Sequence, residues 1–468
     1  MTSSSPEDGQ SAEVPGASPD ATDVPPTDPA PAPDPPARTA ARAPTPRRHR
    51  AHRQASAERA AGYALIAATV VAIIWANIPG DTYSGIWMTE LDVGIGGADA
   101  SFTVRELINS GLMTVFFFTV GLDVRREISI GSLRTWQKAV IPTVAAIAGL
   151  ALPAVIFVLF NLHSGHLYAW AAVISTDTAF LLAALALVGP RQHVRLRVFL
   201  LALSVVDDIG ALTVIAIFYT VGFQLLPLLI AAAGLVLTYF AGRLPVMWRR
   251  PVYGVLWIVI WFAVLASGIE PTLAGVAIAL VIPAAGPDRR RAEGVRDLAE
   301  SFGREPTAQA ARDLARTVRQ TISINERLEA SITPWVSFVI LPAFALANAG
   351  MTITPEVITG AVASPLTWGI VAGLVVGKLV GVFGSTALLK ALRIGDFGPG
   401  LNYRGLAGGA ALCGIGFTIS LYVIDMAMTD VAAQNEARFG ILVAGVVATL
   451  LAAGLFRMPA RAPAGRAA

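Results

Sequence analysis

Two adjacent carboxylates lie in the middle of a long apolar stretch of the sequence. The stretch runs from about residue 198 to 219, and Asp207 and Asp208 stand near its centre. About 20 apolar residues suffice for one helix to cross the hydrocarbon core of a bilayer. Charge at that depth is costly, and two neighbouring carboxylates cannot both ionise cheaply unless a cation joins them. We therefore expect Asp207 and Asp208 to bind a transported metal cation or a proton; a structural pair buried against polar neighbours is the alternative.

One lysine lies in the interior of a predicted span. Lys378 follows Gly377 about halfway along the apolar segment 365–389. A buried ammonium group must lose its proton or find an anion, and Asp207 and Asp208 are the candidate anions. The alternative is that Lys378 extends to the membrane surface, which requires a long reach from a central position.

Two further apolar segments are interrupted at their centres by residues that start or break helices. One contains Thr176 and Asp177, and such residues before an apolar run are typical of a helix N-cap. The other contains Gly414 and Gly416, which favour a break in the helix. Within a membrane this indicates discontinuous helices, whose facing ends carry partial charges that an acid and a base would offset. We assign those roles to Asp177 and Lys378; a simple cap and close helix packing are the alternatives.

The chemistry expected of this constellation is ion exchange. Carboxylate oxygens suit hard cations such as Na⁺ and Li⁺. Because a proton and a metal ion compete for the same carboxylate, exchange needs no additional group, provided that only one side of the membrane has access at a time. Activity should therefore rise as the carboxylates lose their protons.

The composition is that of a polytopic membrane protein and not of a soluble globule. The chain has 468 residues, is 54% hydrophobic and 14% charged, and has a mean hydropathy of +0.62. A net charge of +3 does not suggest nucleic-acid binding. The single Cys413 excludes an intramolecular disulfide and a multi-cysteine metal site, and we expect no cofactor. The first sixty or so residues lack the apolar core of a cleavable signal peptide, so the first hydrophobic segment should act as the insertion signal.

Twelve hydrophobic segments follow one another along the chain. We place them at residues 60–78, 104–122, 139–160, 168–188, 198–220, 224–241, 252–266, 270–284, 332–350, 365–389, 405–428 and 437–456. The loops after the even-numbered segments carry nearly all the basic residues, and the alternate loops carry almost none beyond Arg105 and Arg438 at their edges. The positive-inside rule then predicts twelve transmembrane helices with both termini in the cytoplasm.

We divide the chain into three parts. Residues 1–58 form a disordered cytoplasmic tail, since they are rich in Pro, Ala, Asp, Ser and Thr. Its final basic cluster is a topology signal, with contact to anionic lipid as the alternative. Residues 59–457 form the transmembrane domain, with a charged cytoplasmic loop at 285–331 that contains a surface helix near 307–327. Residues 458–468 form a cytoplasmic C-terminal tail.

Two external loops have distinctive sequences. In the loop 80–103, apolar residues alternate around Gly96 and Gly97, which indicates a β-hairpin whose edge could pair with a second copy; a flexible loop is the alternative. In the turn 267–271, Glu270 is expected at a surface and not in the core.

Four motifs of the chain together resemble the NhaA-type bacterial sodium/proton antiporters. They are VGLDVRRE at 120–127, STDTAF at 175–180, ALSVVDDIGA at 202–211 and CGIGFT at 413–418, and the match runs in order from about residue 60 to 456. The resemblance implies an all-α membrane protein of twelve spans, with inverted repeats at spans three to five and ten to twelve and with crossed, discontinuous spans four and eleven. It also implies a transporter and not an enzyme, placed in the bacterial inner membrane. Its activity would be pH-regulated, electrogenic exchange of about two protons for one Na⁺ or Li⁺, serving sodium and pH homeostasis.

The resemblance also implies roles for individual residues. Asp208 would be the main ligand of the transported Na⁺, and Asp207 would be the second carboxylate and the partner of Lys378. Thr176 and Asp177 would support the site where the helices cross.

A second group of residues is linked by the resemblance to pH response and assembly. Asp123 and Glu329 match acidic positions of the cytoplasmic funnel, and Glu270 stands where members can have a histidine. Ser110 departs from the family pattern, in which an aspartate can occur, and the pH set-point is therefore open. The external hairpin in 80–103 would form the contact of a homodimer.

Three other classes of protein fit parts of the pattern. A sodium-coupled symporter of organic anions has a similar fold, and Lys378 could serve a substrate carboxylate. An intramembrane aspartyl protease should show a Gly-x-Gly-Asp element, but Gly416 is followed by Phe417. A non-transporting sensor would not need the adjacent acids and the lysine.

Overall fold

The computed structural model describes residues 46–95, 98–131, 134–190, 194–220, 222–241, 246–284, 289–394 and 402–458. The chain divides into a unit of residues 1–50 and a unit of residues 51–468, and the second contains all the candidate functional residues. The predictions for the disordered N-terminal tail up to residue 45 and for the tail after residue 458 lie outside the described residues.

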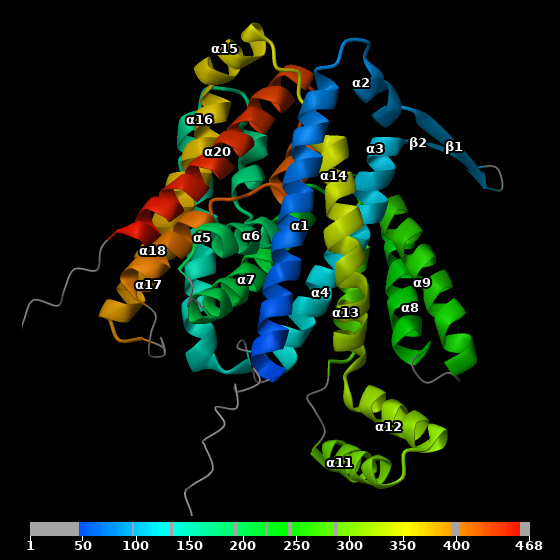
Figure 1. The fold of residues 1–468 in the computed structure, drawn as a ribbon. Helices are drawn as coiled ribbons and strands as arrows, with labels where there is room; N and C mark the ends of the chain where they lie inside the picture. Colours follow the sequence, from blue (N-terminus) through cyan, green and yellow to red (C-terminus); the bar gives the residue numbers. More distant parts are fainter. Residues whose placement is uncertain are drawn as a thin grey trace, which may run out of the picture. The chain divides into compact units, whose positions relative to one another are not determined.

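Within the described ranges, seven helices are long and apolar enough to cross a membrane, or eight if the bent pair described below is one span. Four of the long helices are α1 (Pro46–Ala76), α5 (Trp136–Asn161), α7 (Val194–Phe218) and α20 (Val431–Arg457), all visible in Figure 1. The other three each contain a π-helical turn. They are α3 (Val104–Leu107) with α4 (Met113–Ser129), α13 (Ile324–Trp335) with α14 (Leu341–Asn348), and α16 (Pro365–Ala372) with α17 (Lys378–Ala391).

Shorter apolar helices complete the bundle. They are α8 (Leu225–Ala241), α9 (Val246–Ala266), α10 (Thr272–Val281), and two pairs separated by breaks. In the first pair, a 3₁₀ helix (Leu167–Val173) and α6 (Thr178–Val188) are bent by 48°. The second pair is α18 (Tyr403–Leu412) and α19 (Thr418–Ala427).

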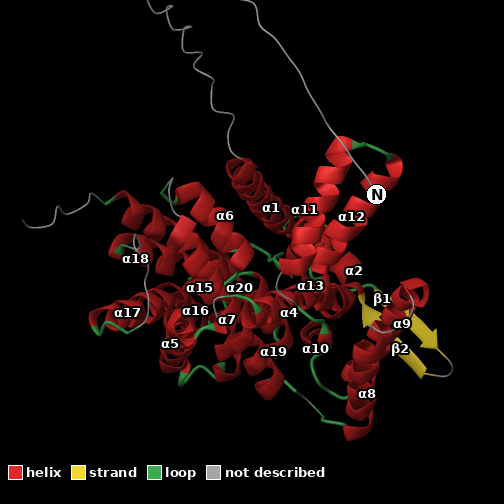
Figure 2. Cartoon of the chain, turned by 90° about the horizontal axis from the view of Figure 1, so that it is seen from below, coloured by secondary structure: helices red, strands yellow, loops and turns green. Residues whose placement is uncertain are grey.

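The remaining elements belong to the connections. They are α2 (Thr82–Trp87), β1 (Glu90–Ile95), β2 (Ala98–Thr103), α11 (Arg289–Arg304), α12 (Ala308–Thr321) and α15 (Pro355–Ala363). The two strands form an antiparallel hairpin (Figure 2), in which Glu90 lies opposite Thr103, so the hairpin prediction for the loop 80–103 is confirmed. The expected surface helix is α12, which Thr307 caps.

Two helices begin earlier than hydropathy indicated. Helix α1 starts at Pro46, so residues 46–58, which we expected in the tail, are helical, and α13 starts at Ile324 inside the expected loop 285–331. Both helices begin with polar residues, which a hydropathy profile does not mark as part of a membrane span. Alanine, arginine, glutamine and glutamate are nevertheless good helix formers, and Ser323 supplies an N-cap for α13.

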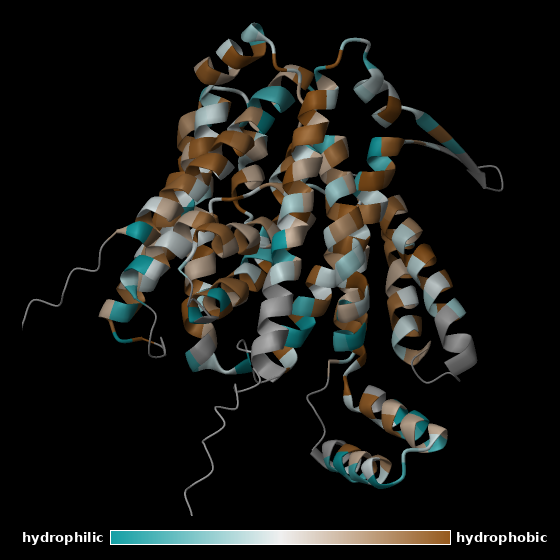
Figure 3. Ribbon diagram, in the orientation of Figure 1, coloured by the Kyte–Doolittle hydropathy of each residue, from teal (hydrophilic) through white to brown (hydrophobic). Residues whose placement is uncertain are grey.

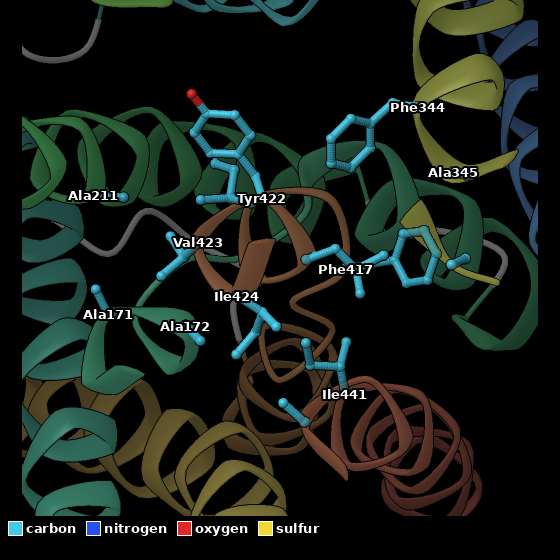
Figure 4. Packing of buried hydrophobic residues seen from close by; sticks show 14 of the residues in the cluster. Ala171, Ala172, Ala211, Phe344, Ala345, Phe417, Tyr422, Val423, Ile424 and Ile441 are labelled. Carbon is cyan, nitrogen blue, oxygen red and sulfur yellow. The ribbon is translucent and has the colours of Figure 1, made fainter. Parts of the chain in front are cut away.

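The bundle is apolar both inside and outside. Figure 3 shows apolar residues along the faces of α8 and α9, and Leu225, Leu226, Leu229 and Leu237 of α8 are all exposed. A soluble protein rarely exposes such a large apolar surface, whereas lipid-facing helices require one. Inside, Phe344, Phe417, Tyr422 and Ile441 meet in the main core cluster around α19 (Figure 4).

Candidate ion-binding site

Two broken helices lie against each other at the centre of the site. The first is interrupted at residues 174–177, between the 3₁₀ helix and α6, and the second at residues 413–417, between α18 and α19. The Asp177 amide donates to the Ile415 carbonyl at 2.8 Å, and the Thr176 hydroxyl donates to the Cys413 carbonyl at 3.0 Å. Each break thus satisfies backbone groups that the other leaves unpaired, which a lipid environment requires.

The Asp177 carboxylate caps two helices at once. Its Oδ1 accepts from the Ala179 and Phe180 amides at the start of α6, at 3.0 and 3.1 Å. Its Oδ2 accepts from the amide and the hydroxyl of Thr418 at the start of α19, at 3.1 and 2.7 Å. The negative charge therefore lies at the positive ends of both helix dipoles. The sequence indicated the first cap; the second depends on the tertiary contact with Thr418.

Glycine is required in the second break because backbones approach closely there. A Cβ at Gly414 would lie 2.5 Å from the Leu374 carbonyl oxygen, and one at Gly416 would lie 2.8 Å from the Ser175 carbonyl oxygen. Both distances are too short for carbon and oxygen atoms, so any side chain would force the two breaks apart.

Lys378 and Asp207 form a fully buried ion pair. The Lys378 Nζ donates to both carboxylate oxygens of Asp207 at 2.9 Å, and the two side chains are 1% and 0% exposed. The Lys378 Nζ also donates to the Ile174 carbonyl, and the Thr176 amide donates to Asp207 Oδ2 at 2.8 Å. Lys378 follows directly after a π-helical turn (Gly373–Gly377), a feature frequent at functional sites. Lys378 therefore points inward and does not extend to the membrane surface.

Asp208 has a different environment from Asp207. It is 8% exposed, and its carboxylate has no hydrogen-bond partner among the residues that the structure describes. Successive residues of a helix point about 100° apart, so only one of the two acids can face Lys378. Asp207 is thus paired with a cationic side chain, whereas Asp208 has no hydrogen bond among the described residues.

Comparison with known proteins identifies the family to which this geometry belongs. The family model described as "Na+/H+ antiporter 1" matches residues 52–456, which is most of the chain. The chain belongs to this family.

The relatives of this antiporter family member are NhaA proteins. A "Na(+)/H(+) antiporter NhaA 1" of Mycobacterium sp. (strain KMS) is 51% identical over 404 residues, which cover 86% of this chain and 66% of the relative. A "Na(+)/H(+) antiporter NhaA" of Herminiimonas arsenicoxydans is 41% identical over 89% of this chain and 67% of its own length. A "Na(+)/H(+) antiporter NhaA 3" of Frankia alni is 37% identical over 84% of this chain and 85% of its own length. The chain thus spans slightly less than two thirds of the mycobacterial relative. Family and apolar helices together make it a multi-pass membrane protein.

The acidic residues predicted for the funnel of this family member share one arginine. Arg126 Nη1 donates to both carboxylate oxygens of Glu329 at 2.7 and 2.9 Å, and Nη2 donates to Asp123 at 3.1 Å. The three side chains are between 20% and 39% exposed. This cluster joins α4 to α13, and the sequence alone did not indicate that Arg126 connects the two acids.

Glu270, which we expected at a surface, is partly exposed, but its carboxylate contacts the core. It is half-buried, and its Oε1 accepts a hydrogen bond from the Tyr422 hydroxyl of α19. Tyr422 is buried in the core, where a phenol needs a hydrogen-bond partner. Glu270 supplies it, so the turn 267–271 packs onto α19.

A second polar network was missed by our reading of the sequence. The Asn109 side chain donates to Asp425 at 2.5 Å, and the Asn348 side chain donates to Asn109 Oδ1 at 2.7 Å. The Arg438 guanidinium lies 3.9 Å from the Asp425 carboxylate. The sequence does show Asn109 and Asn348 as polar residues within apolar segments. It does not show that the two side chains are in contact.

Proposed function

We propose that the chain is an electrogenic, pH-regulated antiporter that exports Na⁺ or Li⁺ in exchange for protons. The observation that carries this proposal is the contrast between the two central acids. Asp207 is neutralised by Lys378, whereas the buried Asp208 lacks a partner among the described residues. A buried carboxylate without a partner must bind a proton or a cation, and the two ligands then exclude each other.

The proposed stoichiometry counts two neighbouring ionisable positions. One is Asp208, which would exchange a proton for Na⁺, and the other is the buried Asp207–Lys378 pair. An exchange of about two protons for one cation would move net charge across the membrane. The activity rises with pH until the carboxylates are ionised, because protons compete with Na⁺. The relatives' names describe Na⁺/H⁺ antiport, in agreement with this proposal.

We propose an architecture of twelve spans with inverted repeats at spans three to five and ten to twelve. In its support, the two broken helices are the middle members of these triplets, and each predicted segment overlaps a described helix. Alternating access would then rock one repeat against the other around the crossing helices. The distribution of basic loop residues supports cytoplasmic termini in a bacterial inner membrane.

Two further features belong to the proposal. Asp123, Glu329 and Glu270 contribute to the pH response. Glu329 and Glu270 each hold another structural element through a hydrogen bond, and Asp123 accepts from Arg126, the arginine that also holds Glu329. The chain forms a homodimer through the loop 80–103, because the β1–β2 hairpin has two strand edges that could pair with another copy. We propose 59–457 as the antiporter domain; its cytoplasmic loop, expected at 285–331, overlaps the start of α13 at Ile324.

The test uses the full chain in proteoliposomes with an acidic lumen. Addition of Na⁺ or Li⁺ outside at pH 7 to 8.5 should make the lumen alkaline, and K⁺ should not. Asp208→Asn should abolish the response, because a neutral amide does not take up a proton at this pH and lacks the negative charge that attracts a cation. Asp313→Asn, which changes an exposed carboxylate of α12, is the matched control and should behave as wild type. The absence of any cation response in folded wild-type protein would refute the antiporter and favour the organic-anion symporter.

A further inference from the structure

Asp208 alone cannot complete a site for Na⁺. Hard cations are held by several oxygen ligands, and one carboxylate supplies at most two. Asp207 cannot contribute freely, because both its oxygens already accept from Lys378 and one also accepts from Thr176. Further oxygens must therefore come from groups close to Asp208.

Most oxygen atoms of the two helix breaks are already occupied. The carbonyls of Ile174, Cys413 and Ile415 accept from Lys378, Thr176 and Asp177, respectively. The carboxylate oxygens of Asp177 each accept two hydrogen bonds at the starts of α6 and α19. These groups hold the helices together, and their use by a cation would uncap both.

The Ser175 hydroxyl is buried without a partner in the first break, and two further hydroxyl groups meet where α6 contacts α7, one turn from Asp208. Ser204 lies four residues before Asp208 on α7, so the two side chains share one helix face a single turn apart. The Ser204 hydroxyl forms a hydrogen bond with the hydroxyl of Thr178, the first residue of α6. Ser204 is 1% exposed, whereas Thr178 is half-buried. The pair thus extends from the carboxylate toward a more accessible position.

We propose that the hydroxyl oxygens of Ser204 and Thr178 are ligands of the transported cation, together with the carboxylate of Asp208. This inference rests on the proposed antiport function. A hydroxyl oxygen that shares one hydrogen with its neighbour keeps lone pairs for a cation. As neutral ligands, the two groups add affinity for Na⁺ without adding charge, so they act on cation binding more than on proton binding.

The test compares apparent KM values for Na⁺ and Li⁺ in proteoliposomes at pH 8.5, with direct ²²Na⁺ binding to the purified protein. The variants are Ser204→Ala, Thr178→Val and the double variant. We expect the KM and the binding constant for Na⁺ to rise about tenfold in the double variant, within the range of 10–100-fold typical of altered metal sites. The maximal rate should stay within about twofold of wild type, because Asp208 is intact.

Two comparisons separate ligation from a structural role. Thr213→Val on the same helix removes an exposed hydroxyl that bonds only to the Ile209 carbonyl, and should leave KM unchanged. Ser204→Cys keeps the size of the side chain but replaces a hard oxygen by a soft sulfur, so it should weaken Na⁺ binding in a folded protein. Conversely, Thr178→Ser keeps the oxygen and should bind Na⁺ nearly as wild type does.

Two results would overturn the proposal in different ways. Wild-type exchange together with unchanged Na⁺ affinity in the double variant and in Ser204→Cys would show that the hydroxyl pair only joins α6 to α7. That outcome would leave the antiport function intact. Failure of wild type itself to bind ²²Na⁺ or to exchange it would remove the proposed function and this inference together.

Discussion

At the scale of single residues, the environments of Asp207 and Asp208 separate two identical side chains. Asp207 accepts three hydrogen bonds from Lys378 and Thr176, whereas Asp208 is slightly exposed and has no hydrogen bond within the described residues. Asp207 therefore holds α7 against α17, and Asp208 is the residue that we propose for exchange. The two neighbouring residues have different environments because successive residues of a helix point in different directions.

Removal of Lys378 should cost more stability than removal of the whole pair. Lys378→Ala leaves a buried carboxylate unpaired, and breaking a buried ion pair in this way costs about 3–5 kcal/mol. The combination of Asp207→Asn and Lys378→Gln leaves no unpaired charge at these two positions and should cost less. Thermal unfolding of the variants in detergent, followed by size-exclusion chromatography, measures the difference. Equal losses for the single and the combined change would contradict the buried ion pair.

At the scale of elements, the two broken helices are held by small residues and shared caps. Asp177 joins the starts of α6 and α19, and the glycines of the second break let the backbones touch. These contacts are close enough that movement of one broken helix must move the other. The crossing should therefore act as a single mechanical unit during transport.

A methyl group at Gly414 should disturb this unit. Gly414→Ala places a Cβ 2.5 Å from a backbone oxygen of Leu374, so the chain must shift, and overpacking of this kind costs about 1–3 kcal/mol. Gly445→Ala in α20 is the matched control, because a Cβ there meets nothing within 4 Å. In the helix interior this change should stabilise the protein by about 0.5–1 kcal/mol. Unfolding in detergent and Na⁺ exchange report both effects; a Gly414→Ala protein with wild-type exchange and stability would argue against the close approach.

At the scale of the whole molecule, a cluster of charged side chains lies where we expect the cytoplasmic funnel. Asp123, Arg126 and Glu329 carry two negative charges and one positive charge when ionised, and they are partly exposed. An excess of negative charge at an opening raises the local cation concentration, and this effect is screened by salt. The cluster should therefore influence how readily Na⁺ enters as well as how α4 packs on α13.

Glu329→Gln should weaken this attraction for Na⁺. We expect the apparent KM for Na⁺ to rise about two- to fivefold at low ionic strength, in keeping with the modest energies of partly exposed charges. The difference should shrink when choline chloride is added, because salt screens the field. Glu300→Gln, which alters an exposed ion pair with Arg296 on α11, is the control and should change neither value. A salt-independent change in KM for Glu329→Gln would indicate a structural effect instead.

The sequence alone determined where the chain is apolar, where helices break and which charges lie in apolar surroundings. These are local properties: hydropathy follows from composition, and a helix in lipid must satisfy its own backbone groups. For the same reason, the interruptions around Thr176 and Gly414 and the central Asp207, Asp208 and Lys378 could be predicted. The polar beginnings of α1 and α13 could not, because helix-forming polar residues leave no hydropathy signal.

Only the tertiary structure decided which groups meet. Residue type and spacing do not distinguish the adjacent aspartates; only the family resemblance named Asp207 as the partner of Lys378, and it is the position of α17 that brings the two together. The contacts of Tyr422 with Glu270 and of Thr178 with Ser204 join residues far apart in the chain. Such pairings depend on the packing of whole helices, whose relative rotation no local pattern specifies. The sequence thus determines which kinds of chemical group are present at the site. The packing of the helices determines which of these groups are hydrogen-bonded to another helix and which are not.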